Sequence, residues 1–165
     1  MRVIYLAGFD VFRQDAIEHG FHLKKLCESY GFEGIFPLDN EAPSNLSCYA
    51  LAQWIYEANI ALIRRADIVM ANLNNFRGAE PDSGTCFEIG FAVAQGKPVW
   101  GYFHDARTLV DQVQHGRVER GVCFDKDGYV IEDFGLPRNL MIACSSHIVI
   151  GDPEECLRKI KAQVV

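Results

Sequence analysis

The sequence predicts an α/β domain of the flavodoxin-like or Rossmann-like kind, a sandwich built on a mostly parallel five-stranded sheet. Short runs of strand-forming residues alternate along the chain with longer segments whose apolar residues recur at helical spacing. The connections are short, which favours parallel strands joined by crossover helices on both faces of the sheet. At 165 residues, 49% of them hydrophobic, the chain has the size of one domain, residues 1–165.

The first half of the chain contributes two strands and two helices. Residues 3–6 are apolar strand formers and predict a buried first strand. Helical spacing follows over residues 15–27, and Gly31 lies where a helix would end. Residues 32–37 form the second expected strand, and an apolar stripe over residues 47–66 predicts a long amphipathic helix.

The middle of the chain continues the alternation. Residues 67–73 are expected to form the third strand and residues 97–103 the fourth. The polar segment 74–81 between them predicts an exposed loop. A helix over residues 82–95 then ends at Gly96.

The last third of the chain is less regular. Residues 105–139 give only weak signals, with a turn predicted at 125–128 between short extended pieces. Residues 147–150 resemble a fifth strand, and Asp152 followed by Pro153 predicts the start of a final helix. In such folds ligands bind at the carboxyl ends of the strands. We therefore expect one crevice formed by the loops at 7–12, 38–42, 73–84 and 103–105.

Composition excludes several classes of protein. A net charge of −6 disfavours a nucleic acid polymer or a membrane surface as partner. No apolar stretch approaches the roughly 20 residues that cross a bilayer, and the N-terminus does not resemble a signal peptide, so we expect a cytoplasmic protein. Six scattered cysteines without a CxxC pair suggest free thiols and no zinc site. His19 and His22 are interpreted as a solvated helix face, and neither metal nor cofactor is expected.

The segment around Glu88 carries the clearest chemical signal. Asp82 has the character of a helix N-cap, which places Glu88 in the second turn among apolar neighbours. A carboxylate is costly to bury there unless something pairs with it or uses it. Helical side chains lean toward the N-terminus, so Glu88 should project over Gly84, where a sugar would have room. Two carboxylates around one anomeric carbon are what retaining glycosyl transfer requires.

A structural interpretation of the same residues is equally compatible with the sequence. Asp82 would then be only a cap, and Glu88 would pair with an arginine such as Arg13 or Arg77. The residues alone leave both interpretations open.

Beyond these signals, the chain resembles the nucleoside 2-deoxyribosyltransferase family. The resemblance rests on five segments in the right order: YLAGFDVF at 5–12, PLDN at 37–40, ADIV at 66–69, DSGTCFEIG at 82–90 and NLM at 139–141. It implies an enzyme of nucleoside salvage that exchanges the base of a 2′-deoxynucleoside for a free nucleobase. The exchange would pass through a covalent deoxyribosyl-enzyme intermediate, with retention and without a cofactor.

The resemblance also implies roles for individual residues. Glu88 would be the nucleophile, oriented by Tyr5, and Asp82 would contact the base and relay its proton. Asp39 and Asn40 would shape the pocket for sugar and base. Asn139 would reach into the site of a neighbouring subunit, which predicts a homo-oligomer built from dimers, a tetramer or a hexamer.

Five further residues complete the expected substrate site. Gly84 leaves room for the ligand and Gly8 follows the first strand, while Phe9 and Phe12 either contact the base, exclude a 2′-hydroxyl or belong to the core. Asn59 stands where some family members carry an aspartate near the sugar.

Two other functions remain open at this point. A related hydrolase would pass the sugar of a deoxynucleoside or its 5′-monophosphate to water, and a side hydrolase activity is compatible with the transferase. The loop after the first strand lacks the phosphate-holding pattern associated with the nucleotide hydrolases, which favours nucleosides. A non-catalytic nucleotide-sensing module is the other alternative, and it would gain nothing from Glu88 beside Asp82.

Overall fold

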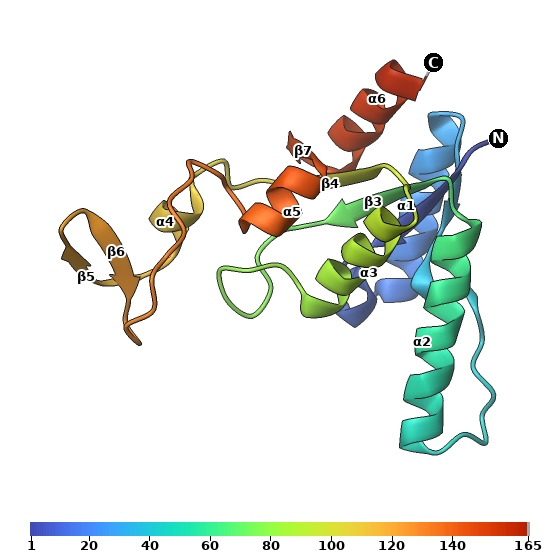
Figure 1. Cartoon of the computed structure of the whole chain (residues 1–165). Helices are drawn as coiled ribbons and strands as arrows, with labels where there is room; N and C mark the ends of the chain where they lie inside the picture. Colours follow the sequence, from blue (N-terminus) through green and yellow to red (C-terminus); the bar gives the residue numbers. More distant parts are fainter. Residues whose placement is uncertain (165) are drawn as a thin grey trace.

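The centre of the molecule is a sheet of five parallel strands in the order β2-β1-β3-β4-β7 (Figure 1). The structure is a computed structural model and describes residues 1–164. The strands are β1 (Val3–Ala7), β2 (Glu33–Ile35), β3 (Ile68–Asn72), β4 (Val99–Phe103) and β7 (His147–Ile150). Counted along the sheet in chain order, this is the 2-1-3-4-5 arrangement of flavodoxin-like folds. The predicted fold class and all five predicted strands are confirmed.

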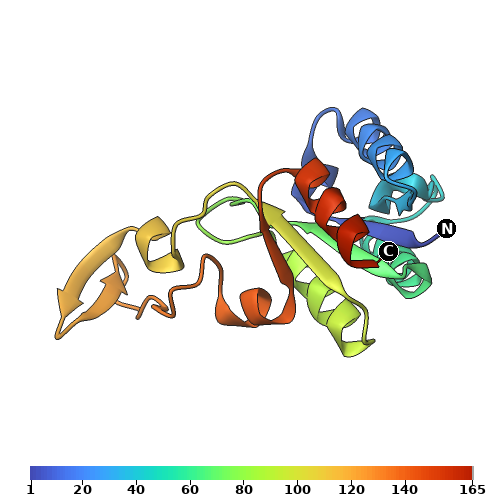
Figure 2. The ribbon, with the colours of Figure 1, turned by 90° about the horizontal axis from the view of Figure 1, so that it is seen from above.

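Helices cover both faces of this sheet (Figure 2). The helices α1 (Ala16–Ser29) and α6 (Pro153–Val164) pack on one face, and α2 (Cys48–Arg65), α3 (Ser83–Ala94) and α5 (Leu140–Ser145) lie on the other. Because strand side chains alternate between the faces, Ile4 and Leu6 join the α1/α6 core while Tyr5 and Ala7 join the core beneath α2 and α3.

The helix starts agree with the sequence pattern. The Ser47 side chain accepts a hydrogen bond from the Ala50 amide, and Asp152 accepts one from the Glu155 amide at 2.8 Å. Such caps satisfy amides that have no partner in the first helical turn. Strand β2 is shorter than residues 32–37, because the chain turns into the short 3₁₀ helix η2 (Pro37–Asp39). In the described part of the chain no helix is long and apolar enough to cross a membrane.

Residues 104–138 form an arm that projects from the sandwich (Figures 1 and 2). It contains α4 (Leu109–Gln112) and an antiparallel hairpin of β5 (His115–Glu119) and β6 (Val122–Asp125). The turn predicted at 125–128 is confirmed, since the Gly128 amide donates to the Asp125 carbonyl at 3.1 Å. Neither the hairpin nor helix α5 was predicted.

Candidate active site

A cavity of about 380 Å³ opens at the carboxyl ends of β1 and β2. Its walls come from the chain after β1, the chain after β2, helix α2 and the start of α3. The lining residues are Gly8, Val11, Phe12, Pro37, Leu38, Asn40, Ala42, Trp54, Ile55, Ala58, Asn59, Asp82, Gly84, Thr85 and Glu88. Of the loops expected at the crevice, 73–84 contributes Asp82 and Gly84 at its end, whereas 103–105 contributes nothing to this lining. Helix α2 forms a further wall that was not among the expected loops.

Glu88 lines this pocket and is held by Tyr5. The Tyr5 hydroxyl donates a hydrogen bond to Oε1 of Glu88 at 2.5 Å. Tyr5 is fully buried on β1 and points toward α3, so the bond spans the interface between strand and helix. The sequence-based expectation that Tyr5 and Glu88 meet therefore agrees with the geometry.

Burial changes the acidity of both groups. Desolvation raises the pKa of Glu88 to about 7, the Tyr5 hydrogen bond lowers it in part, and the charge of Asp82 raises it further. Burial and the neighbouring Glu88 carboxylate together raise the pKa of Tyr5 well above its ordinary value. Tyr5 thus stays a hydrogen-bond donor at neutral pH, while Glu88 is close to the midpoint of its titration.

Asp82 both caps helix α3 and faces the pocket. Its Oδ2 accepts hydrogen bonds from the Thr85 amide at 3.0 Å and from the Thr85 hydroxyl at 3.1 Å. Both of these hydrogen bonds end on Oδ2, which leaves Oδ1 available to a ligand in the pocket. Besides capping the helix, Asp82 therefore lies in the pocket, because it lines the same cavity as Glu88.

The arginine pairing considered for Glu88 is wrong. Arg13 forms an ion pair with Asp15 at 2.8 Å. The guanidinium of Arg77 lies over the Phe76 ring, 4.5 Å from its centroid. Glu88 is stabilised by the Tyr5 hydroxyl instead.

Two glycines allow close approach at the pocket. Gly8 has φ +153°, and a Cβ atom there would lie 2.8 Å from the Cβ of Asn72 and 2.9 Å from Oδ2 of Asp10. A Cβ on Gly84 would lie 3.0 Å from Oδ2 of Asp82. A side chain at either position would disturb a polar group at the edge of the site.

The other predicted substrate residues divide into two groups. Phe12, Asn40 and Asn59 line the pocket, and Oδ1 of Asn59 is buried without a hydrogen-bond partner among residues 1–164. Phe9 and Asp39 lie outside the lining. Phe9 stacks on Phe76 with ring centroids 4.9 Å apart, and Asp39 accepts a hydrogen bond from the Phe36 amide at 2.8 Å.

Asn139 lies at the start of α5, away from this pocket. Its Nδ2 donates to Oε1 of Glu132 at 2.6 Å, and its Oδ1 accepts from the Met141 amide. The other oxygen of Glu132 accepts from the Leu140 amide at 2.9 Å. Asn139 is thus fixed next to the arm and outside the cavity lining of its own chain.

Apart from Asn59, the residues of helix α2 that line the pocket were not predicted from the sequence. Trp54, Ile55 and Ala58 belong to the apolar stripe that predicted this helix, and they line the pocket. Further along the same helix, Leu62 and Ile63 enter the core. One apolar stripe therefore contributes residues both to the pocket and to the core. The helical spacing alone does not show which residues belong to which.

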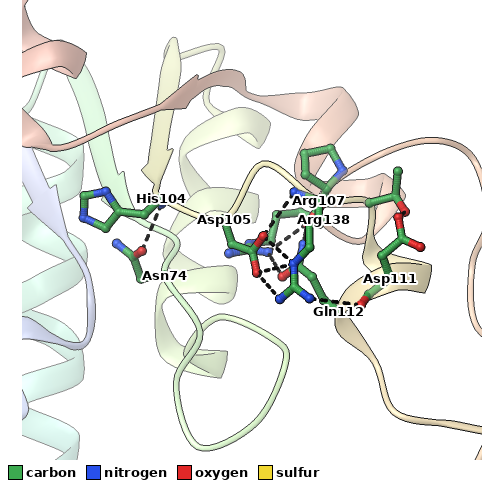
Figure 3. Close-up of polar contacts among 9 residues, drawn as sticks. Asn74, His104, Asp105, Arg107, Asp111, Gln112 and Arg138 are labelled. Carbon is green, nitrogen blue, oxygen red and sulfur yellow. Dashed lines mark hydrogen bonds and ion pairs between the residues drawn. The ribbon is translucent and has the colours of Figure 1, made fainter.

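The arm is joined to the sheet by a buried arginine (Figure 3). Nε of Arg138 donates to the Leu73 carbonyl at 2.9 Å, and Nη1 donates to Oε1 of Gln112 at 2.8 Å. The guanidinium lies 4.0 Å from the centroid of the Phe103 ring. This junction connects the arm to Leu73, at the start of the loop that leads to Asp82.

The arrangement does not include a metal site. Among the described residues, no group of three or more His, Cys, Asp or Glu side chains is placed to hold a metal ion. The interpretation of His19 as part of a solvated face is wrong, since its Nε2 lies 3.1 Å from Oδ1 of the buried Asp10.

Taken together, a parallel α/β sandwich with two carboxylates in one pocket, one of them held by a buried tyrosine, is typical of enzymes that cleave or transfer glycosidic bonds. Comparison with known proteins narrows this class. Residues 4–141 match the family model described as nucleoside 2-deoxyribosyltransferase. The chain belongs to this family.

Individual known proteins are similar to this chain. A 2-desoxiribosyltransferase from Leishmania mexicana superimposes with a TM-score of 0.81 at 31% identity, with 100% of both chains covered. A 2-deoxyribosyltransferase from Bacillus psychrosaccharolyticus has a TM-score of 0.61 at 19% identity, covering 96% of this chain and 90% of that one, and shares the fold. An uncharacterized protein of Schizosaccharomyces pombe is 31% identical over 159 residues, which is 84% of this chain and 74% of the relative.

Proposed function

We propose that the protein transfers the 2-deoxyribosyl group between nucleobases of 2′-deoxynucleosides, with Glu88 as the nucleophile. The observation that carries the proposal is the 2.5 Å hydrogen bond from Tyr5 to Glu88 in a pocket that also presents Asp82. Family membership supplies the reaction class. The presence of two carboxylates in one pocket supports the covalent mechanism that we propose.

In the first half-reaction, Glu88 attacks C1′ of the donor. The bond from C1′ to the base nitrogen breaks as an ester forms between C1′ and the oxygen of Glu88. Asp82 delivers a proton to the departing base, so the base leaves neutral. Tyr5 keeps Glu88 in its attacking orientation through the bond to Oε1.

In the second half-reaction, an acceptor base attacks C1′ from the side that the first base left. The ester breaks, Glu88 regains its negative charge, and the proton lost by the acceptor nitrogen returns to Asp82. Two displacements at one carbon retain its configuration. No external reductant, oxidant or cofactor enters this sequence. Water in place of the acceptor would give the side hydrolase activity.

The lining of the pocket favours nucleosides over 5′-monophosphates. Among the described lining residues the ionisable side chains are Asp82 and Glu88, and none is lysine, arginine or histidine. A phosphate placed there would meet negative charge without a cationic partner, which is unfavourable in a partly buried site. The remaining lining is largely apolar and suits the faces of a sugar and a base.

We further propose that the protein works as a homo-oligomer in which Asn139 completes the site of a neighbouring subunit. The support is that Asn139 lies outside its own pocket and is held rigidly by Glu132. The projecting hairpin agrees with this, because an isolated two-stranded hairpin is only marginally stable in water. Exposed apolar side chains of the arm include Val118 in the hairpin and Tyr129 after it. The six free cysteines are compatible with the cytoplasmic location that we propose.

The test is base exchange by the purified protein. Deoxyinosine and adenine should yield deoxyadenosine, and Glu88→Ala should lower the rate by roughly three to five orders of magnitude, as expected for loss of a nucleophile. Accumulation of free deoxyribose without deoxyadenosine would favour the hydrolase. No sugar chemistry with any base of a wide panel would contradict catalysis and favour the sensing module.

A further inference from the structure

Asp10 is a buried carboxylate that the proposed chemistry does not use. It is 4% exposed and lies in the short 3₁₀ helix η1 (Phe9–Phe12), directly after β1. Its Oδ1 faces Nε2 of His19 on α1 at 3.1 Å, and its Oδ2 accepts a hydrogen bond from Nδ2 of Asn72 at 2.9 Å. The carboxylate therefore connects η1 to a helix on one side and to the end of β3 on the other.

Burying a carboxylate costs several kcal/mol unless specific partners compensate it. An apolar residue in this position would fill the space without that desolvation cost. The contacts of Asp10 are therefore kept at some cost to the stability of the fold. Those contacts continue into a polar chain, because Oδ1 of Asn72 accepts from Nδ2 of Asn74 at 2.8 Å. Oδ1 of Asn74 in turn accepts from the His104 amide at 3.1 Å (Figure 3).

The segment that Asp10 anchors is a wall of the pocket. Gly8, Val11 and Phe12 line the cavity, and they stand on both sides of Asp10 in the sequence. Phe12 is 58% exposed, and one face of its ring is covered by Phe76. The orientation of this wall depends on how η1 is attached to the rest of the fold. The side chain of Asp10 provides the buried polar contacts of η1, to His19 and Asn72.

We propose that Asp10 is a positioning residue for substrate: held by His19 and Asn72, it fixes η1 so that Val11 and Phe12 form the wall against which the nucleoside binds. The inference rests on the proposed function of this pocket and goes beyond it, since Asp10 lies outside the lining and acts through its neighbours. Glu88, Tyr5 and Asp82 stand on β1 and α3 and do not depend on η1 for their placement.

A second contact keeps η1 in place when the polar one is removed. Phe9 stacks on Phe76 at 4.9 Å, and Phe12 stacks on the same ring at 5.4 Å. Asp10→Asn should therefore loosen the wall without detaching it. Asparagine preserves the size of the side chain and leaves no unpaired charge in the interior.

The experiment compares Asp10→Asn and His19→Gln with His22→Gln as matched control. His22 is an exposed histidine three residues further along the same helix. We expect the first two variants to raise KM for deoxyinosine roughly tenfold with kcat within about twofold of wild type, because the wall binds substrate and does not react. The double variant should be no worse than the more affected single one, since the two residues act as a unit. His22→Gln should match wild type.

Hydrogen exchange supplies a readout that does not need turnover. In Asp10→Asn the amides of residues 9–13 should exchange faster, and those of residues 84–92 should be unchanged. An unchanged KM with a lowered Tm would overturn the proposal and leave Asp10 a purely structural residue. A fall in kcat at constant KM would also overturn it. If the wild type shows no base exchange, the proposed function fails. Hydrogen exchange then tests the positioning role of Asp10 by itself. Unchanged hydrogen exchange at the amides of residues 9–13 in Asp10→Asn would contradict that role.

Discussion

The pocket and the arm differ in how far burial within the chain fixes their residues. Glu88 stands on α3, which packs on the sheet, and Tyr5, its hydrogen-bond partner on β1, is fully buried. In the arm every residue of β5 is exposed, and Tyr129 beyond the hairpin is 73% exposed. The arm is joined to the sandwich at its base, where Arg138 is buried against the sheet.

This difference separates two kinds of constraint. The pocket is fixed by burial within one chain, so the positions of Glu88 and Asp82 follow from the fold itself. The hairpin of the arm gains little from burial in its own chain, and a surface of that kind is typical of a segment that packs on another molecule. Substitutions in the two regions should accordingly affect different measurements.

After Glu88, the largest effect within the pocket is expected at Asp82. Asp82→Asn keeps an oxygen that can accept from the Thr85 amide, so the helix cap survives while the proton relay is lost. We predict a fall in kcat of roughly 10²–10⁴-fold with little change in Tm. Asp152→Asn, at the cap of α6 on the opposite face, is the control and should keep full activity. Near-normal kcat in Asp82→Asn would show that Asp82 is only a cap.

Core and arm should differ sharply in their effect on the free energy of unfolding. Ile68 is 1% exposed in β3, and Ile68→Ala should cost about 2–5 kcal/mol. Val118 is 59% exposed in β5, and Val118→Ala should change the free energy of unfolding by no more than about 0.5 kcal/mol. Urea denaturation of both variants at low protein concentration checks this. Equal costs would mean that the arm is part of the same folding unit as the sheet.

The sequence predicted the sandwich well because its signals are local. The five strands and the caps at Asp82 and Asp152 follow from runs and single residues that the chain shows directly. The hairpin was missed because its tight turn uses Arg120 and Gly121, both at positive φ, where arginine is an unusual choice. Helix α5 has only six residues, too few to show a helical period.

The candidate site was predicted where its residues share one segment. Glu88, Asp82 and Gly84 belong to the start of α3, and their common location follows from helix geometry. The apolar stripe of α2 looks the same whether it faces a core or a cavity, so Trp54 was not recognised. The contact between His19 and Asp10 depends on how α1 packs, which no local pattern specifies.

The pH dependence of activity should respond to Tyr5. The Tyr5 hydrogen bond lowers the pKa of Glu88, so Tyr5→Phe should raise that pKa further above about 7. The reactive form of Glu88 is the carboxylate, and the acidic limb of kcat/KM should move to higher pH, with a loss of about tenfold near pH 6. Tyr30→Phe is the control, because Tyr30 donates to Glu154 at 3.2 Å far from the pocket. An acidic limb at the same pH in wild type and Tyr5→Phe would contradict this role.

The smallest effect concerns stability. The folded-state pKa of Glu88 is raised from 4.5 to about 7, so the native state binds this proton more tightly than the unfolded chain. Stability is therefore lost as pH rises from about 4.5 through 7. Glu88→Gln removes the ionised form and should raise Tm at pH 8, by about 2–4 °C for each kcal/mol relieved, but not at pH 4. The same Tm difference at both pH values would contradict the burial of this carboxylate.

The covalent step itself can be observed directly. A 2-fluorinated deoxynucleoside donor slows breakdown of the ester, so an active preparation should accumulate enzyme carrying one fluorinated sugar. Mass analysis after proteolysis should then find the added mass on the peptide that contains Glu88, and Glu88→Ala should acquire none. If an active preparation remained unmodified at Glu88 under these conditions, or carried the sugar on another residue, Glu88 would not be the nucleophile.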